Sequence, residues 1–402
     1  MKKTIIFLSL FISLGSVYYF QPIAYEILKL KTFDSFIQEK QESGNFVVLN
    51  ITEEDIANEG GYPLSRQTLA QIHINLLRQG AMGVGWVMAF PQPDRFGGDF
   101  EFTEALQFSP SVLAMFEGEG EYPPTSGTVI LGPEDTGGMM ATGVIQNIDV
   151  LKYNASQGIA VARTDADNLI RRLPLLMRTP DGWVSSYGTE VLKVLAGADT
   201  YVIKTNDNGV EEVRVKGLPP VKTDSLGRKW ISWVVPRETS LAEMDVENRF
   251  VFVGFTAKGI MPQLATPVGL LEPHKIQAAL AESILIQDSP YIPDYALALE
   301  LLIFLFSLVF VWLVLNVFGI TWGVSFFALV FVSTAFYGVT TIQKGILVDV
   351  TWALVSQFIT ATVAFYIRFR EQYNKMKEMK LEYDKNEQAF KNEASDIVNN
   401  PF

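Results

Sequence analysis

Residues 46–90 read FVVLNITEEDIANEGGYPLSRQTLAQIHINLLRQGAMGVGWVMAF, and this stretch decides the fold class. Its first six residues are a short apolar, β-branched run that predicts a buried strand, and residues 81–90 predict a second one. Between them, Ser65 can cap an amphipathic helix over residues 66–79. A strand, a helix and a strand at this spacing predict a parallel strand pair with a right-handed crossover.

The same alternation continues towards the C-terminus. The Gly- and Pro-rich stretch 117–143 predicts irregular structure. On either side of it, we expect helices over residues 99–108, 185–196 and 273–287, and strands over residues 111–116, 201–204, 213–216, 229–235 and 249–255. The pattern predicts the α/β class: a mixed, mainly parallel sheet flanked by helices, with a helical transmembrane bundle and a cytoplasmic helix outside it.

Three apolar blocks follow this region, and each can cross about 30 Å of hydrocarbon as a helix. They cover residues 296–318, 320–342 and 345–367. They contain few polar side chains. We expect Glu300 and Asp349 to face lipid headgroups, and Gln357 to find a partner inside the helix bundle.

A further apolar block, residues 4–20, follows Lys2 and Lys3. It predicts an uncleaved anchor, with a cleaved signal peptide as the alternative. Basic residues precede the first block and follow the last, so both termini are expected in the cytoplasm. The predicted organisation is an anchor (1–23), an extracytoplasmic domain (24–294), three transmembrane helices (295–368) and a cytoplasmic helical tail (369–402).

Composition excludes several classes of function. The chain has no cysteine, so disulfides, thiolate nucleophiles and zinc–thiolate sites are impossible. It has only two histidines, and we therefore expect no catalytic triad, no metal centre, no cofactor and no enzyme activity. Residues 4–294 carry a formal net charge of −13, against −12 for the whole chain, which argues against a nucleic-acid partner.

Several short motifs occur in a characteristic order. They are LKLKTFD (28–34), FVVLNITEEDI (46–56), YPLSR (62–66), GAMGVGW (80–86), DADN (165–168) before RRLP (171–174), VFVGFTAKGI (251–260), and EPH (272–274). In this order, and with three predicted spans after them, they resemble the CHASE domain of type 2, an extracellular sensor module of bacterial membrane receptors. The resemblance implies a sensor in the bacterial inner membrane with its large domain outside.

The chain departs from that family pattern at three positions. The family usually has acidic residues where Thr52 and Val87 stand here, after the first and second strands, and glycine where His274 stands. If those acids bind ligand in relatives, the resemblance implies that this chain binds something else, or nothing.

Four residues are candidates for ligand binding: Arg66, Asp165, Asp167 and Arg171. Arg66 opens a helix beside a sheet edge, where a guanidinium can grip a carboxylate or phosphate, or can pair with Asp99 or Asp167. Asp165 and Asp167 could bind a hard cation, but a turn that positions the two arginines is the more ordinary interpretation.

The tail carries a 4,3 stripe that includes Phe369, Tyr373, Met376, Tyr383 and Phe390 and ends with Ala394 and Ile397; Lys380 and Glu387 interrupt it. It predicts a short parallel coiled coil, or else a solvated helix, and we expect a homo-oligomer, most simply a dimer. In relatives such a segment leads to an output domain. Here the sequence ends at Phe402, so we expect a signalling or envelope partner to provide the output. The alternative function is an assembly protein whose outer domain packs into an envelope array.

Overall fold

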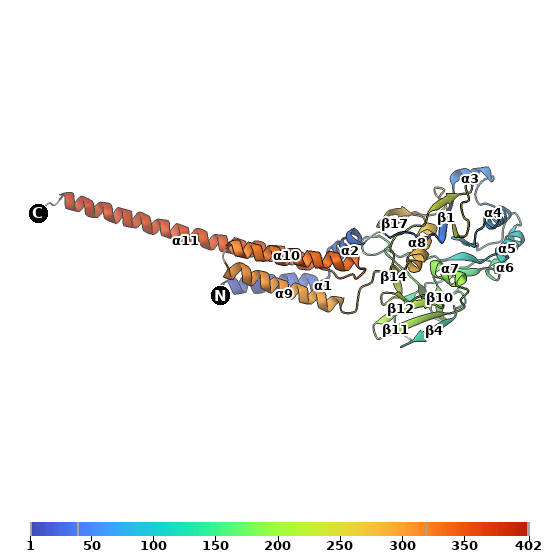
Figure 1. Ribbon diagram of the computed structural model, residues 1–402, viewed down its shortest axis with the longest axis horizontal. Coiled ribbons are helices and arrows are strands. Elements are labelled where there is room, and N and C mark those ends of the chain that lie inside the picture. The colour runs from blue at the N-terminus through green and yellow to red at the C-terminus, as the bar shows by residue number, and fades with distance from the viewer. Residues whose placement is uncertain (1, 38–39, 135, 319, 400–402) are drawn as a thin grey trace. The chain divides into compact units, whose positions relative to one another are not determined.

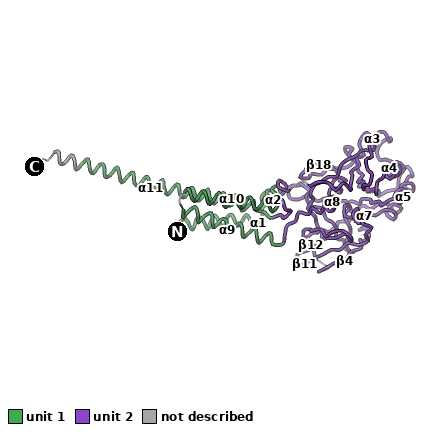
Figure 2. Tube along the Cα trace, viewed as in Figure 1, with its two compact units in different colours: residues 1–32, 294–341, 348–402 green, residues 33–293, 342–347 purple. Residues whose placement is uncertain are grey.

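The structure is a computed structural model that describes residues 2–37, 40–134, 136–318 and 320–399, apart from the side chains of residues 2, 320 and 393–399. It divides into two compact units, shown in Figure 2. One unit comprises residues 1–32, 294–341 and 348–402, and the other comprises residues 33–293 and 342–347. We describe each unit by itself.

The second unit is built on a seven-stranded sheet with the order β15-β1-β16-β2-β3-β6, in which β7 also pairs with β3. All neighbouring strands run parallel except β3 and β6. Of the strands of this sheet, Figure 1 labels β1. The strands are β1 (Phe46–Ile51), β2 (Gly83–Trp86), β3 (Ser111–Glu117), β6 (Val144–Ile145), β7 (Ser156–Ile159), β15 (Glu238–Ser240) and β16 (Phe250–Phe255).

The predicted pairing of the first two strands is wrong. Strands β1 and β2 run in the same direction, but β16 lies between them and pairs with both. All six side chains of β16 are buried, which suits a central position. Positions 83 and 85 of β2 require glycine, because a Cβ on Gly83 or Gly85 would come within 2.9 Å of the Phe250 ring.

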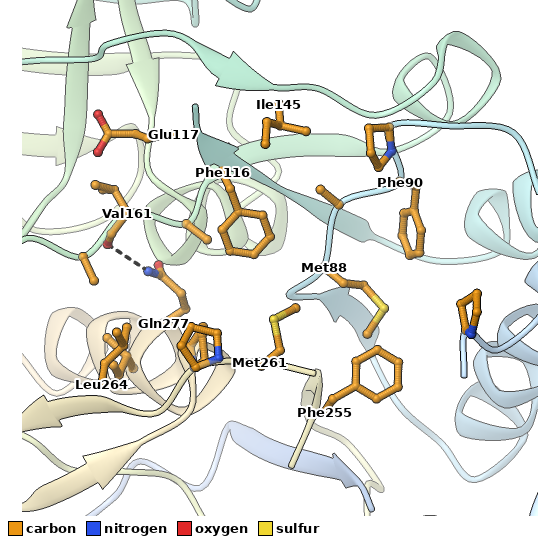
Figure 3. A pocket seen from close by; sticks show the side chains of 18 of the residues that line it. Met88, Phe90, Phe116, Glu117, Ile145, Val161, Phe255, Met261, Leu264 and Gln277 are labelled. Carbon is orange, nitrogen blue, oxygen red and sulfur yellow. Dashed lines mark hydrogen bonds between the residues drawn. The ribbon is translucent and has the colours of Figure 1, made fainter. Parts of the chain in front are cut away.

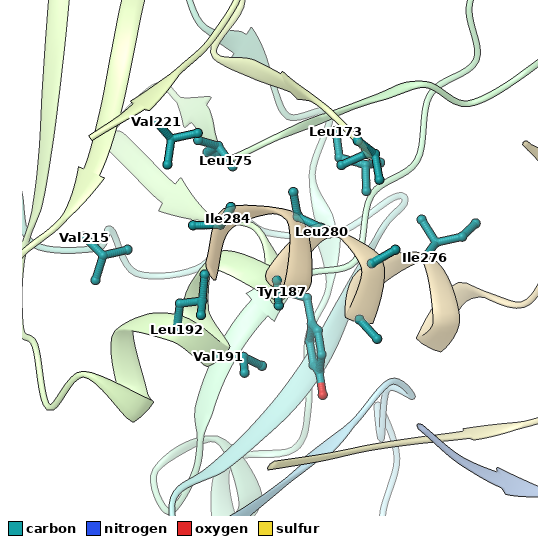
Figure 4. Packing of buried hydrophobic residues seen from close by; sticks show 14 of the residues in the cluster. Leu173, Leu175, Tyr187, Val191, Leu192, Val215, Val221, Ile276, Leu280 and Ile284 are labelled. Carbon is teal, nitrogen blue, oxygen red and sulfur yellow. The ribbon is translucent and has the colours of Figure 1, made fainter. Parts of the chain in front are cut away.

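Helices cover both faces of this sheet. Val47, Leu49 and Ile51 of β1 pack on the face covered by α3 (Glu53–Asn58), α4 (Arg66–Arg78) and α5 (Asp99–Gln107). Phe46 and Val48 alternate with them and pack on the other face. There they meet α7 (Tyr187–Leu195) and α8 (Pro273–Leu285), whose apolar side chains fill the centre of Figure 4.

Smaller sheets complete the unit, and the mixed α/β class is confirmed. Residues 117–143 are not wholly irregular, since they contain β4 and β5, and β4 pairs in parallel with the distant β11. The remaining elements are β13 (Val221–Lys222), β12 (Gly209–Val215), β11 (Tyr201–Asn206) and β4 (Thr128–Leu131) in one sheet; β10 (Gly182–Ser185), β9 (Leu176–Thr179) and β5 (Met139–Met140) in another; the pairs β14 (Arg228–Trp230) with β8 (Arg172–Pro174) and β17 (Leu264–Thr266) with β18 (Gly269–Leu271); and α6 (Asp149–Lys152).

The first unit is helical. Of the helices in the described part of the chain, four are long and apolar enough to cross a membrane, and all four lie in this unit. They are α1 (Lys2–Phe20), α9 (Ala296–Val317), α10 (Ile320–Gln343) and α11 (Thr351–Asn399). Helix α2 (Ile23–Phe36) follows α1 and was not expected from the sequence.

The last helix differs from the prediction at both ends. It begins at Thr351 rather than near residue 345, and it continues without a break into the tail. Asp349 explains the start, because its carboxylate accepts the backbone N–H of Thr351 at 2.8 Å. The exposed stripe residues Phe369, Tyr373 and Met376 lie on this helix, whereas Ala394 and Ile397 lie outside the described side chains.

The expected exposure of Glu300 and Asp349 to headgroups is wrong, because both side chains are buried within the unit. Glu300 accepts hydrogen bonds from the Tyr18 hydroxyl at 3.0 Å and from the Asp349 backbone at 2.8 Å. Asp349 accepts one from the Tyr25 hydroxyl at 2.6 Å. Gln357 is also buried, and its amide donates to Thr334, so its predicted partner inside the bundle is confirmed.

Candidate functional site

A cavity of about 530 Å³ opens at the carboxyl edge of the main sheet. Because β2, β3, β7 and β16 run parallel, their carboxyl ends share this edge. In open α/β sheets, ligands bind at such an edge, where neighbouring strands lead to helices on opposite faces. Here β16 leads to α8 on one face and β2 leads to α5 on the other.

The wall of the cavity is mostly apolar, as Figure 3 shows. Met88 and Phe90 follow β2, Phe116 is the last residue but one of β3, and Phe255 ends β16. The first turns of α4 and α8 close two sides. The complete lining is Tyr62, Pro63, Leu64, Arg66, Leu69, Met88, Ala89, Phe90, Pro91, Phe116, Glu117, Ile145, Ala160, Val161, Ala162, Phe255, Met261, Pro262, Leu264, Pro273, Ile276 and Gln277.

Of the four candidate residues, Arg66 is the one that lines this cavity. Its guanidinium carbon lies over the Phe90 ring, 4.2 Å from the centroid. Its Nε is 3.5 Å from Asp99 Oδ1, so the predicted pairing with Asp99 is confirmed, and its Nη2 donates a long 3.4 Å hydrogen bond to the Gln92 carbonyl. Neither the Nε nor Asp99 Oδ1 makes a hydrogen bond of normal geometry.

The carboxylate of the neighbouring Asp94 is hydrogen-bonded by backbone N–H groups. It accepts N–H groups from Arg66 at 2.8 Å, Gly98 at 3.1 Å and Phe96 at 3.2 Å. Although burial opposes the effect, these hydrogen bonds hold the pKa of Asp94 below its usual range. Burial lowers the pKa of Arg66, against the attraction of Asp99 and Asp94.

The other three candidates form a separate cluster around Arg171, which is fully buried. Its guanidinium binds Asp34 through Nε at 2.9 Å and Nη2 at 2.7 Å, and Asp167 through Nη1 and Nη2, both at 2.7 Å. A longer contact of 3.5 Å joins Nη1 to Asp165. All five N–H groups of the guanidinium are therefore engaged.

The Asp165–Asp167 segment is a turn that serves the arginines. The Asn168 N–H donates to the Asp165 carbonyl, and the Asp165 N–H donates to the Leu169 carbonyl. Asp165 also pairs with Arg172, which reaches Asp224 at 3.3 Å. Although burial opposes it, the hydrogen bonds that Arg171 donates to Asp167 and Asp34 raise the pKa of Arg171. The geometry thus favours the turn interpretation over a cation site.

Both histidines are buried in packing positions. His73 accepts the Trp86 indole N–H on Nδ1 at 3.2 Å, and burial lowers its pKa to about 4. His274 contacts Asn50 at 2.9 Å, and burial lowers its pKa to about 3. The ring of His274 lies against Gly254, where a Cβ would come within 2.3 Å of it.

Sequence reasoning missed the apolar wall and Asp34. Asp34 is the last residue of the LKLKTFD motif, but no local sequence pattern links it to Arg171, which is 137 residues away. The wall residues follow the ends of parallel strands, and a known strand order would have brought them together. That order depends on β16, which inserts between β1 and β2 from far along the chain.

Comparison with known proteins bears on the family. No curated protein matches the chain, and no solved structure matches it. The family model of the CHASE2 domain, in contrast, matches residues 5–317, which is most of the chain. The protein therefore belongs to the CHASE2 family of extracellular sensor domains.

Proposed function

We propose that this protein is a membrane-anchored sensor that binds a small, largely apolar ligand in the cavity at the carboxyl edge of its main sheet. The main observation that supports this proposal is the cavity itself. Its volume of about 530 Å³ suits a small molecule, and it combines apolar walls with few polar groups, which is typical of ligand sites. Both histidines are engaged in packing, which supports a binding role rather than a catalytic one.

The departures from the family pattern support an apolar ligand. Thr52, which stands where the family has an acid, caps α3 by accepting the Asp55 N–H. Val87, at the second such position, is buried. The chain therefore has no carboxylate at either position, and the nearby cavity wall is formed by Met88, Phe90 and Phe255.

A site-specific probe tests ligand binding. The full chain, held in amphipol and labelled with ¹³C on its methionine methyl groups, is titrated with 1-octanol. We expect chemical-shift changes at Met88 and Met261, which line the cavity, and none at the exposed Met379 of α11. Ala160→Phe should fill the cavity and abolish both changes. If neither octanol nor octanoate shifts Met88 or Met261, the cavity is not a ligand site.

The topology is part of the proposal: both termini are cytoplasmic, and residues 33–293 lie outside. Because the chain has no cysteine, single cysteines can report on each side. An impermeant maleimide should label Asp207→Cys in intact cells and should label Gln388→Cys only after lysis. Labelling of Gln388→Cys in intact cells would reverse the orientation.

We also propose a parallel dimer, joined partly along α11. The stripe residues Phe369, Met376, Tyr383 and Phe390 are each more than half exposed in the single chain, and a partner helix would cover them. Mass measurement in nanodiscs tests this. Removal of the residues after Arg370 should leave the dimer intact, because the interrupted stripe associates weakly and most of the dimer free energy should come from the spans or the outer domain. A monomer of the full chain at micromolar concentration would refute the dimer.

One observation favours an assembly protein instead. Phe96, Phe100 and Phe108 are all more than 60% exposed around α5, and exposed aromatic groups often mark contact surfaces. A scaffold would require them for association, whereas the sensor would not. Phe100→Asp with Phe108→Asp should therefore leave the oligomer mass unchanged; loss of the oligomer would favour the assembly role.

A further inference from the structure

The polar groups on the cavity wall differ in how completely they are satisfied. Glu117 is bound by Arg163 through both carboxylate oxygens, at 2.5 and 3.3 Å. Gln277 donates to the Val161 carbonyl at 3.3 Å and accepts the Gly188 N–H at 3.2 Å. The first of these hydrogen bonds is drawn in Figure 3. Neither side chain needs a further partner from a ligand.

Arg66 is different, because most of its hydrogen-bonding capacity is unused. A guanidinium has five N–H groups, and that of Arg66 makes one long hydrogen bond of 3.4 Å. Its side chain is only 13% exposed, so water replaces the missing partners poorly. The Phe90 ring lies under the guanidinium carbon, and a guanidinium held over an aromatic ring can bind an oxyanion through its remaining N–H groups.

Asp99 does not use up this capacity. Its Oδ1 lies 3.5 Å from Arg66 Nε without a hydrogen bond, and its Oδ2 accepts the Asp94 N–H at 2.8 Å. Arg66 is also the one Lys or Arg on the cavity wall among the described residues. The wall therefore presents surplus donors at one place and apolar side chains such as Met88, Phe255 and Met261 over the rest.

We propose that the cavity binds a small carboxylate with an apolar chain, with its carboxylate on the edge of Arg66 and its chain against Met88, Phe255 and Met261. This proposal rests on the proposed function and names the class of its ligand. A single-chain molecule fits a cavity of about 530 Å³. The carboxylate would accept hydrogen bonds from guanidinium N–H groups that have no protein acceptor, so the acid should bind more tightly than a neutral molecule of the same shape.

The test compares octanoate with octanamide, which has the same chain and no charge. Affinities are measured from the Met88 and Met261 methyl shifts of the full chain in amphipol. We expect octanoate to bind about tenfold more tightly. Arg66→Gln should bring the ratio to about one, and the matched control Arg78→Gln, which removes an exposed arginine from the same helix, should leave it unchanged.

A second variant keeps the test decisive if Arg66→Gln does not fold. Asp99→Asn removes the carboxylate that competes for Arg66 and can still accept the Asp94 N–H, so octanoate should bind more tightly than to the natural protein. Equal affinity for octanoate and octanamide in the natural protein overturns the carboxylate proposal but leaves the apolar sensor intact. Binding of neither compound overturns both.

Discussion

Arg66 and Arg171 are the same residue type, and sequence reasoning treated both as candidates for ligand binding, yet the structure gives them opposite surroundings. Arg171 is fully buried and has all five N–H groups bound, chiefly by Asp34 and Asp167. Arg66 borders a cavity and makes one long hydrogen bond and one loose ion pair. The comparison teaches that saturation by partners, more than charge or burial, separates a structural arginine from one that can bind a ligand.

The largest expected loss of stability follows from removing Arg171, whose N–H groups are all hydrogen-bonded. Arg171→Ala leaves Asp34, Asp165 and Asp167 without their shared cation, and an unpaired buried charge costs about 3–5 kcal/mol. Thermal and denaturant unfolding of the full chain should show this loss. Arg78→Ala, at an exposed position, should change stability little. A loss as small as that of Arg78→Ala would mean that the cluster is not structural.

The next effect appears on acidification. Burial lowers the pKa of His73 to about 4 and of His274 to about 3, whereas histidine in an unfolded chain titrates near 6.5. Between these pKa values the unfolded state binds more protons than the folded state. The free energy of unfolding should therefore decrease as the pH is lowered below about 6.5, by up to roughly 1.4 kcal/mol per pH unit for each histidine. These histidines lie on α4 and α8, the helices whose first turns line the cavity.

The Arg171 cluster should act in the opposite sense. Burial raises the pKa of Asp34 in spite of Arg171, so the Asp34 contribution to stability is present at low pH and is lost as pH rises through the folded pKa. His73→Gln and His274→Gln should flatten the fall of stability between pH 6.5 and 5.5, and Asp34→Asn should remove the loss of stability that accompanies ionisation of Asp34 as pH rises. Unfolding followed as a function of pH checks both signs, and an unchanged slope in the histidine variants contradicts the assignment.

The sequence predicted the elements of the fold better than their arrangement. Residues 46–51, 66–79 and 249–255 carry strong local periodicity, and each became a strand or helix within about one residue of its predicted ends. Periodicity contains no information on which strand pairs with which. It therefore could not show that β16 separates β1 from β2, or that β4 pairs with β11.

The same limit applies to the two arginines. The pairing of Arg66 with Asp99 could be proposed because both residues lie near the ends of neighbouring helical segments. The partner Asp34 of Arg171 lies on α2, a helix that the sequence did not predict, and the cavity exists only after the parallel strands have assembled. Local patterns could point to both arginines as charged groups near helix and turn signals, whereas long-range packing determines the partners of each.

The smallest expected effect concerns Arg66 itself. Arg66→Ala removes an ion pair of 3.5 Å without a hydrogen bond and a contact with Phe90, and pairs of this kind contribute about 1 kcal/mol or less. Unfolding of the full chain without ligand should therefore show a much smaller loss than Arg171→Ala does. The loss caused by Arg66→Ala should grow when octanoate is added, because the natural protein binds octanoate more tightly and gains more stability from it than Arg66→Ala does.

This dependence on ligand separates a structural role of Arg66 from a binding role more sharply than either measurement alone. A purely structural Arg66 would lower stability equally with and without octanoate, because its contribution would not depend on what fills the cavity. An Arg66 that binds the carboxylate makes the difference between the natural protein and Arg66→Ala grow with ligand concentration. If that difference stays constant over the whole titration while Met88 still reports binding, Arg66 stabilises α4 and the ligand is held by the apolar wall alone.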